Sequence, residues 1–259
     1  MTENPPPGLP ADPTPGQRAR HGELAAGLAA VEQRIATACA AAGRPRDEVT
    51  LVVVTKTYPA SDVRLLSGLG VTDVAENRDQ DAAPKAVECR DLPLSWHFVG
   101  QLQTNKVRSV LGYADRVHSV DRLRLVEALS AGVLKTGRAA LGCLIQVDLG
   151  GDSDAGEFAG GRGGALPGAV PELADALEAA PGLRLDGVMA VAPLLGRFAG
   201  NPRAAFDRLA EIASRVREAH PAATMVSAGM SGDLEQAIAA GATHVRVGTA
   251  VLGARPPLG

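Results

Sequence analysis

One lysine occupies a position where its amine could react with a carbonyl group. Lys56 directly follows the apolar run Leu51-Val52-Val53-Val54-Thr55, which is typical of a buried strand. A lysine amine that is partly withdrawn from water loses its proton more readily and can form a Schiff base. The alternative for Lys56 is a strand-end lysine whose flexible stem carries its charge out to water.

Two segments near the other end of the chain have residues suited to holding a phosphate. They are Ser227-Ala228-Gly229-Met230-Ser231-Gly232 and Arg246-Val247-Gly248-Thr249. Glycines let backbone N–H groups approach an anion, and we expect the Ser231 hydroxyl at a helix N-terminus. Ordinary turn glycines with a serine cap are the alternative. Arg246 lies two residues before Gly248 and should point into the same strand end, toward a ligand or a buried carboxylate.

A reactive lysine and a phosphate site together fit a phosphorylated aldehyde held as an imine. Pyridoxal 5′-phosphate (PLP) requires a lysine, a phosphate site and a group facing its ring nitrogen, and Arg246 is the candidate for the third. Because arginine keeps its proton, it would leave the pyridine nitrogen largely unprotonated and weaken carbanion stabilisation. A barrel enzyme for a phosphorylated sugar, working without PLP, is an alternative that leaves Lys56 without a role unless the enzyme is aldolase-like.

The elements that must position these residues alternate between strands and helices. Eight apolar runs are predicted strands: residues 50–55, 71–75, 95–99, 116–120, 141–148, 184–191, 224–228 and 243–247. Between them lie predicted helices near 60–69, 78–89, 103–112, 121–135, 168–180, 202–219 and 231–240. Eight βα units in about 200 residues predict an α/β fold, a single-domain (β/α)₈ TIM barrel, with a doubly wound open sheet as runner-up.

The predicted barrel has a leading helix and a tail before it. Leu24, Leu28, Val31 and Ile35 fall on one stripe, so residues 20–42 are expected to form an amphipathic helix. Residues 1–18 are rich in proline and lack apolar periodicity, which predicts a disordered tail. We therefore assign residues 19–259 to the barrel domain. The glycine-rich stretch 150–168 is expected to be a flexible loop on the functional face.

A barrel of this kind should place its functional residues at the C-terminal ends of the strands. Polar or glycine residues follow every predicted strand, which satisfies that demand, although several are also ordinary caps, Asp121 among them. The strand-end residues are Lys56; Glu76 and Asn77; His97, Gly100 and Gln101; Ser119 and Asp121; Asp148; Met189 and Pro193; Ser227 to Ser231; and Arg246 to Thr249.

Composition excludes several classes of function. The net charge is −3, Lys and Arg are scattered, and aromatic residues make up 3% of the 259 residues, which argues against nucleic-acid binding. No apolar run is long enough to span a bilayer, and no signal core precedes the helix, so we expect a cytoplasmic protein. The three cysteines Cys39, Cys89 and Cys143 have neither metal-site nor disulfide spacing, so no metal is expected.

These residues form motifs that resemble the PLP homeostasis protein family, whose members are similar to the N-terminal barrel of alanine racemase. The resemblance covers roughly residues 24–255 and rests on five motifs in the same order. They are Val53-Val54-Thr55-Lys56-Thr57, Glu76-Asn77-Arg78-Asp79-Gln80, Trp96 to Lys106, Ser227-Ala228-Gly229-Met230-Ser231 and Arg246-Val247-Gly248-Thr249-Ala250.

The resemblance implies a role for each residue of the cofactor site. Lys56 would form the internal aldimine, and Arg246 would face the pyridine nitrogen. Asn77 would lie near the ring. The phosphate would be held by Ser231, Gly248 and Thr249, and Met230 would also belong to the cofactor site.

Some positions depart from the family pattern. Ala75 stands where a glycine is usual, and Asp154-Ala155-Gly156 stands where members often have Lys-x-Gly. Residues 158–167 look like an extension. The cofactor motifs are intact, so these departures concern the loop at the pocket entrance.

Two functions compete for such a barrel. The resemblance implies a PLP carrier that buffers or delivers the cofactor to apo-enzymes, with no robust turnover; the alternative is an amino-acid racemase in which Lys56 is the base. Racemisation needs a second acid/base group on the opposite face, which alanine racemase takes from a further domain of its partner subunit. The sequence ends at Gly259, and Tyr58 and Tyr113 are its only tyrosines. We therefore expect a monomeric carrier and assign no certain catalytic residue.

Overall fold

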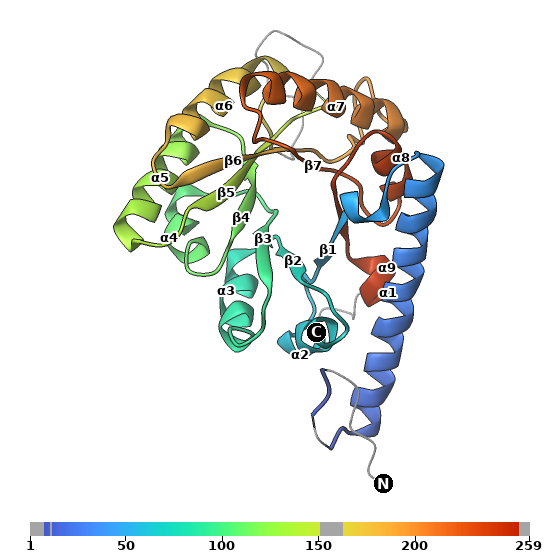
Figure 1. Ribbon diagram of the computed structural model, residues 1–259. Helices are drawn as coiled ribbons and strands as arrows, with labels where there is room; N and C mark the ends of the chain where they lie inside the picture. The colour runs from blue at the N-terminus through green and yellow to red at the C-terminus, as the bar shows by residue number, and fades with distance from the viewer. Residues whose placement is uncertain (1–7, 11, 151–162, 254–259) are drawn as a thin grey trace.

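Eight parallel strands form a closed barrel in which each strand pairs with its neighbours in chain order (Figure 1). The computed structural model describes residues 8–10, 12–150 and 163–253. The strands are β1 (Thr50–Val54), β2 (Asp73–Glu76), β3 (Ser95–Phe98), β4 (Arg116–Val120), β5 (Leu141–Gln146), β6 (Leu183–Met189), β7 (Met225–Ser227) and β8 (His244–Val247). The sheet closes because β8 pairs with β1, with Thr50 opposite His244 and Val53 opposite Val247. This closure confirms the (β/α)₈ barrel and rules out the open sheet.

Helices surround the barrel as an outer layer (Figure 1). They are α1 (Pro15–Ala41), α2 (Ala60–Gly68), α3 (Asp79–Glu88), α4 (Val107–Val110), α5 (Leu123–Thr136), α6 (Val170–Ala179), α7 (Pro202–Ala219), α8 (Leu234–Ala239) and α9 (Thr249–Leu252). Short 3₁₀ turns lie at Arg46–Glu48, Thr104–Lys106 and Pro167–Ala169. The predicted helix near 103–112 is therefore a 3₁₀ turn followed by a single α-helical turn.

The leading helix begins earlier than the sequence predicted. Thr14 caps α1 by accepting a bond from the backbone of Gln17, whose side chain in turn accepts from Thr14, and Pro15 occupies the first helical position. This capping box starts the helix at Pro15, so residues 15–18 are helical and do not belong to a disordered tail. Leu24, Val31 and Ile35 are buried, as expected, where α1 packs along α8 and α9.

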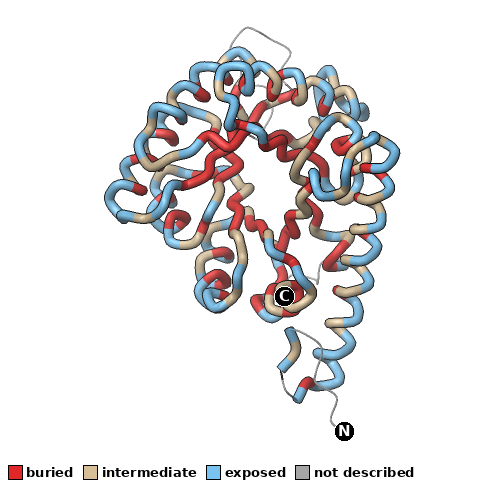
Figure 2. Tube along the Cα trace, in the orientation of Figure 1, coloured by how far each residue is buried: buried red, intermediate tan, exposed pale blue. Residues whose placement is uncertain are grey.

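The two faces of the barrel strands differ in character. Outward-facing residues such as Val53, Val74 and Val117 are apolar and pack under the helices. Figure 2 shows the resulting buried inner ring and exposed outer surface. Several inward-facing residues are polar, including His97, His118 and Arg246. A polar interior in a closed barrel requires internal hydrogen-bond partners, because buried polar groups without partners are destabilising.

Three further sequence features concern a cysteine, a helix cap and the glycine-rich loop. Cys143 is a core residue. Asp121 does not cap α5: Arg122 is the N-cap residue, and the Asp121 carboxylate forms an ion pair with it. Residues 151–162, which contain most of the glycine-rich loop, lie outside the described residues. After them, Ala165 bridges to β5 beside Val147, so the chain rejoins the barrel there.

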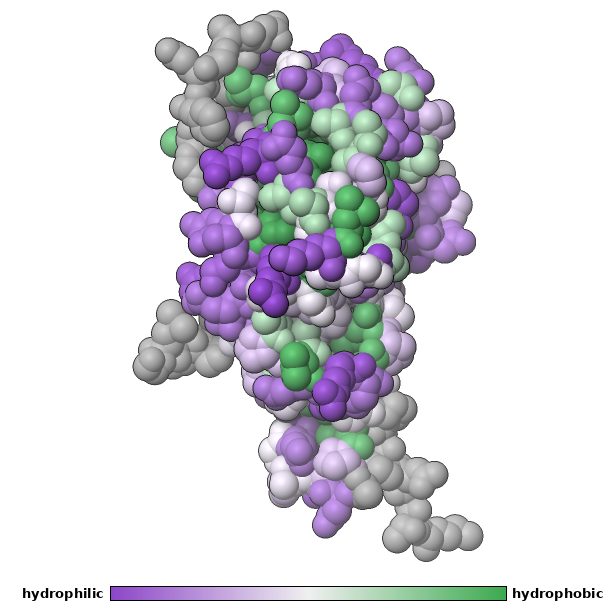
Figure 3. Space-filling view, turned by 90° about the vertical axis from the view of Figure 1, so that its left-hand side faces the viewer, coloured by the Kyte–Doolittle hydropathy of each residue, from purple (hydrophilic) through white to green (hydrophobic). Residues whose placement is uncertain are grey.

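The outer surface mixes polar and apolar residues. Figure 3 shows one side of the molecule, where hydrophobic residues form separate patches among hydrophilic ones. Leu194, Leu195 and Leu134 are among the most exposed large apolar side chains. Within the described ranges, no helix has the length and apolar character needed to cross a membrane.

Candidate functional site

Lys56 lies in a tight turn immediately after β1. The Tyr58 N–H donates to the Thr55 carbonyl at 3.1 Å, and Thr57 has a φ of 72°. A bond from the first to the fourth residue with positive φ only at the third is the pattern of a type II turn, which normally has glycine there. Thr57 is β-branched, so this conformation is strained. The turn leaves the Lys56 side chain half-buried at the C-terminal end of the barrel.

A buried ion pair lies beneath this turn. Glu76, fully buried at the end of β2, accepts from the Thr55 hydroxyl at 2.6 Å and pairs with Lys85 of α3. The Lys85 amine also donates to the Thr55 carbonyl at 2.9 Å. Glu76 therefore faces outward, to α3, and is not part of the barrel mouth where strand-end logic had placed it. Its contribution is to fix the backbone just before Lys56.

Asn77 follows Glu76 on the strand next to Lys56. Its backbone carbonyl packs so closely on Gly100 that a Cβ at Gly100 would lie 2.0 Å from it. Only glycine allows this approach. Since β1 pairs with β2 on one side and with β8 on the other, Lys56 lies between the strand ends that hold Asn77 and Gly248. The structure thus brings these predicted residues to one rim.

The loops after β7 and β8 are joined to each other. The Ala250 N–H donates to the Ser231 hydroxyl at 3.3 Å, and Gly229 adopts a φ of 89° that favours glycine. Arg34 of α1 donates to the Ser231 carbonyl at 3.0 Å and pairs with Glu235. The leading helix therefore anchors the loop that contains Ser231.

Individual residues of these loops differ from expectation. The helix α8 begins at Leu234, so Ser231 lies in the preceding turn and not at a helix N-terminus. The Met230 side chain is exposed, and its N–H donates to the Asp233 carboxylate at 2.6 Å, which leaves that N–H committed. Gly248 is the N-cap of α9, and Thr249 is its exposed first residue.

Arg246 is a buried cation at the centre of the site. Its side chain is 4% exposed and donates to the Ser227 hydroxyl at 2.5 Å and to the Ala190 carbonyl at 2.9 Å. No carboxylate in the described part of the chain forms an ion pair with it. Burial lowers the pKa of Arg246 to about 10, so it remains charged at neutral pH. A buried charge without a counter-charge is costly. The guanidinium has five N–H donors, more than these two bonds use, which favours a ligand that accepts a hydrogen bond from it.

Both ring nitrogens of His97 are hydrogen-bonded. His97 lies in the barrel interior, where one ring nitrogen contacts Asp73 at 2.9 Å and the other contacts His118 at 2.8 Å. It does not lie at the strand-end rim, and its contacts are those of a satisfied interior histidine.

Both tyrosines have structural contacts. The Tyr58 hydroxyl donates to the Gly253 carbonyl at 2.9 Å, and its ring lies beneath the Arg20 guanidinium. Tyr113 packs edge-on against Trp96, and burial raises the pKa of its hydroxyl strongly. Tyr113 is therefore a packing residue.

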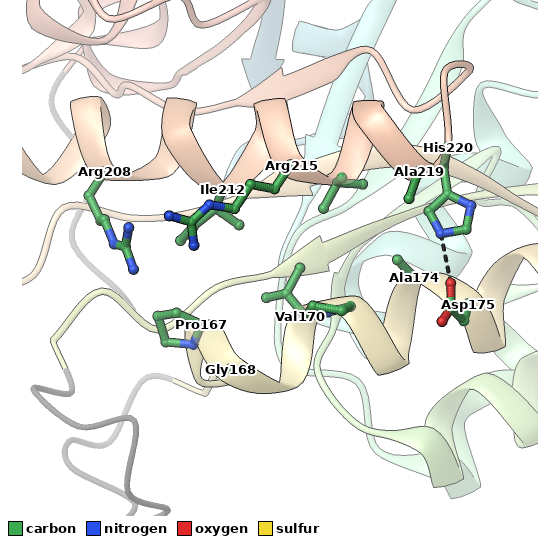
Figure 4. Close-up of a pocket in the computed structure, with 12 residues that line it drawn as sticks. Pro167, Gly168, Val170, Ala174, Asp175, Arg208, Ile212, Arg215, Ala219 and His220 are labelled. Atoms are coloured by element: carbon green, nitrogen blue, oxygen red, sulfur yellow. Dashed lines mark hydrogen bonds and ion pairs between the residues drawn. The ribbon is translucent and has the colours of Figure 1, made fainter.

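A separate pocket lies on the helical layer between α6 and α7 (Figure 4). It has a volume of about 240 Å³ and is lined in part by Pro167, Arg208 and Arg215. An ion pair between His220 and Asp175, at 3.0 Å, joins the two helices at one end. None of the predicted site residues lines it.

Sequence reasoning missed Lys85, His118 and Asp73. Lys85 lies on the buried face of α3, three residues after Ala82, so a charge on an apolar stripe was the available signal. Arg116 and His118 alternate with Val117, and period-two alternation placed both polar side chains on the inner face.

The chain matches a known protein family over most of its length. The family model "Alanine racemase, N-terminal domain" matches residues 27–256. A pyridoxal phosphate homeostasis protein of Mycobacterium leprae is 42% identical over 248 residues, covering 90% of this chain and 93% of that protein.

Two solved structures are also similar. A protein of unknown function from Bifidobacterium adolescentis has a TM-score of 0.79 at 29% identity, covering 90% of this chain and 96% of its own. PipY of Synechococcus elongatus PCC7942, solved with PLP bound, has a TM-score of 0.73 at 31% identity. The match covers 89% of this chain and 100% of the PipY chain.

The closed barrel and its strand-end site define a member of the alanine racemase N-terminal domain class. Within that class, the chain belongs to the family of pyridoxal phosphate homeostasis proteins.

Proposed function

We propose that this protein binds PLP and takes part in its homeostasis, buffering the cofactor or delivering it. The observation that carries the proposal is Arg246, a buried cation at the barrel end where Lys56 emerges, with no carboxylate partner in the described part of the chain. The PLP-bound structure of PipY, which shares the fold at 31% identity, supports the same ligand.

The residues present fit this cofactor. Arg246 supplies a charged donor for a ring nitrogen, and Ser231 joins the two loops that would enclose the phosphate. A Cβ at Gly232 would meet nothing within 4 Å, so this loop has room beside it. When bound, PLP supplies an aldehyde that Lys56 holds as a Schiff base.

Each residue of the proposed site has a separate task. Lys56 binds the aldehyde carbon, Arg246 faces the pyridine nitrogen and Asn77 lies beside the ring. Ser231, Gly248 and Thr249 hold the phosphate. The N–H of Met230 is already bonded to Asp233, so Met230 would contribute only its exposed side chain to the cofactor site.

We infer a carrier with weak or no turnover. The Tyr58 hydroxyl is bonded to the Gly253 carbonyl, and Tyr113 packs on Trp96, so neither is poised as the second acid/base group of a racemase. The recipients would be apo-enzymes that use PLP, and a monomer working in the cytoplasm as one barrel domain after a short tail is part of this proposal.

The test is the absorption spectrum of the purified protein titrated with PLP, beside Lys56→Ala. We expect a Schiff-base band in the wild type that borohydride bleaches, and no such band in the variant. A wild-type spectrum equal to that of free PLP would contradict the proposal. Sustained racemisation of alanine that depends on Lys56 would contradict the carrier role alone.

A further inference from the structure

Four buried side chains and the partly exposed Asp73 form one continuous hydrogen-bonded chain across the barrel interior. From Arg246 Nη1 the links run to Ser227 Oγ (2.5 Å), from Ser227 Oγ to His118 Nδ1 (3.0 Å), from His118 Nε2 to His97 Nδ1 (2.8 Å) and from His97 Nε2 to Asp73 (2.9 Å). Ser227, His118 and His97 are at most 1% exposed. The chain thus connects β8 at the proposed cofactor site with the first residue of β2 at the opposite end of the barrel.

When both histidines are neutral, the two ends fix the direction of every link. Arg246 can only donate, and ionised Asp73 can only accept. His97 Nε2 must therefore carry a proton toward Asp73, which leaves His97 Nδ1 to accept from His118 Nε2. His118 Nδ1 then accepts from the Ser227 hydroxyl, whose oxygen accepts from Arg246.

Burial supports the neutral His118 that this direction requires. Desolvation, aided by nearby His97, Arg246, His244 and Arg116, holds the pKa of His118 well below 6.5. Burial also acts to raise the pKa of Asp73, but hydrogen bonds from His97 and Thr72 outweigh it, so that the pKa is lowered and the carboxylate is ionised.

The other titratable or charged groups that face the chain have hydrogen-bond partners of their own. Arg116 of β4 donates to Asp186 of β6 at 3.1 Å and to Ser95 of β3 at 3.1 Å. His244 of β8 contacts the Thr243 hydroxyl at 2.9 Å. Asp233, before α8, acts on Arg246 through its charge but accepts from the Met230 N–H. None of these contacts replaces a link of the chain.

We propose that Asp73, through His97, His118 and Ser227, positions the Arg246 guanidinium against the ring of the bound cofactor. The proposal rests on the proposed function. The carboxylate lies three side chains away, so it orders Arg246 without neutralising it at the site. The Ser227 hydrogen is committed to His118, so only an oxygen lone pair faces Arg246, and the guanidinium keeps its remaining donors for the ligand. These four residues are positioning residues and do not touch the cofactor.

The first test reads the protein alone, without PLP. Ring nitrogen-15 NMR of the wild type at pH 7 reports which nitrogen of each histidine carries the proton. We expect His97 and His118 both neutral and protonated at Nε2. A His118 protonated at Nδ1, or charged, would reverse the Ser227 link and overturn the proposal.

The second test compares Ser227→Ala with Ser227→Thr and with the control His244→Gln. His244 is another inward-facing histidine of the same barrel, but it is outside the chain. Loss of the Arg246 partner should weaken PLP binding about tenfold in Ser227→Ala. It should also shift the pH profile of the absorption band, because the pyridine nitrogen loses a fixed donor. Ser227→Thr should restore both properties, and His244→Gln should leave both unchanged.

The outcomes separate the two proposals. If the wild-type protein does not bind PLP, both the proposed function and the positioning of Arg246 against the cofactor ring are overturned. The NMR result still reports the direction of the hydrogen bonds in the chain. Wild-type binding with unchanged affinity and pH profile in Ser227→Ala overturns the positioning role alone. A purely structural role would lower the melting temperature of Ser227→Ala and leave both readouts of its bound cofactor unchanged.

Discussion

Two buried cations on either side of Lys56 are held in opposite ways. Lys85 has a carboxylate partner, Glu76, and a backbone carbonyl, so its charge is balanced within the protein. Arg246 donates to a hydroxyl and a carbonyl but has no carboxylate partner among the described residues. The difference indicates that the first cation stabilises the fold around Lys56, while the second is arranged for a ligand.

Removing Lys85 should produce the largest loss of stability. Lys85→Met leaves Glu76 buried without its counter-charge, which should lower the free energy of unfolding by about 3–5 kcal/mol. Urea denaturation followed by circular dichroism measures this. Glu76→Leu combined with Lys85→Met should recover most of the loss, and Arg203→Met, which breaks an exposed pair with Asp207, should change stability by less than about 0.5 kcal/mol. Equal losses in Lys85→Met and Arg203→Met would remove the structural role of the buried pair.

Acid should destabilise the protein through His244, which lies in the barrel interior near Arg246. Burial lowers the pKa of His244 from 6.5 to about 4, so between these values the unfolded chain binds the extra proton. Stability should therefore be full above pH 6.5 and fall by roughly 2–3 kcal/mol as the pH decreases to about 4. His244→Gln should show a shallower decrease between pH 6.5 and 4.5 in urea titrations. An unchanged slope in that variant would show that His244 is not the group responsible.

Removing Arg246 should affect binding far more than stability. Arg246→Met loses two hydrogen bonds but also removes an uncompensated buried charge, so we expect stability to change by no more than about 1 kcal/mol. PLP affinity should decrease at least about tenfold, because the ring loses its charged donor. Isothermal titration and thermal melts measure the two quantities on the same sample. A stability loss comparable to that of Lys85→Met would mean that the two cations are not different in kind.

The smallest expected effect is at the strained turn that holds Lys56. Thr57→Gly relieves the positive φ of 72° but gives the unfolded chain more freedom, so the net gain in stability should be below about 1 kcal/mol. The more flexible turn should position Lys56 less well and slow Schiff-base formation, measured by stopped-flow absorption. The control Thr57→Ala removes the branched side chain but keeps the steric penalty at that φ. If both variants form the Schiff base at the same rate as wild type, the turn does not position the lysine.

Most of the fold could be predicted from the sequence because its signals are local. Each strand is a short apolar run, and the structure has all eight in the predicted order, with β1 at Thr50–Val54 against a predicted 50–55. The start of α1 was predicted too late because residues rich in proline hid the capping box of Thr14 and Gln17.

The supporting contacts of the site could not be predicted because they join distant segments. The motifs identified Lys56, Ser231 and Arg246, and the structure places all three at the same end of the barrel. By contrast, the contact of His118 with Ser227 spans 109 residues, and that of Arg34 with Ser231 spans 197. Glu76 ends β2 as predicted, but its strand-end position could not tell that its side chain faces outward, to α3.

Peptide mapping after borohydride reduction of the protein mixed with PLP identifies the lysine that holds the cofactor. The chain has four lysines, Lys56, Lys85, Lys106 and Lys135, and only Lys56 lies at the proposed site. We expect mass spectrometry to find one reduced pyridoxyl group per chain, on the peptide that contains Lys56. A label on Lys106 or Lys135, or one spread over several lysines, would contradict it.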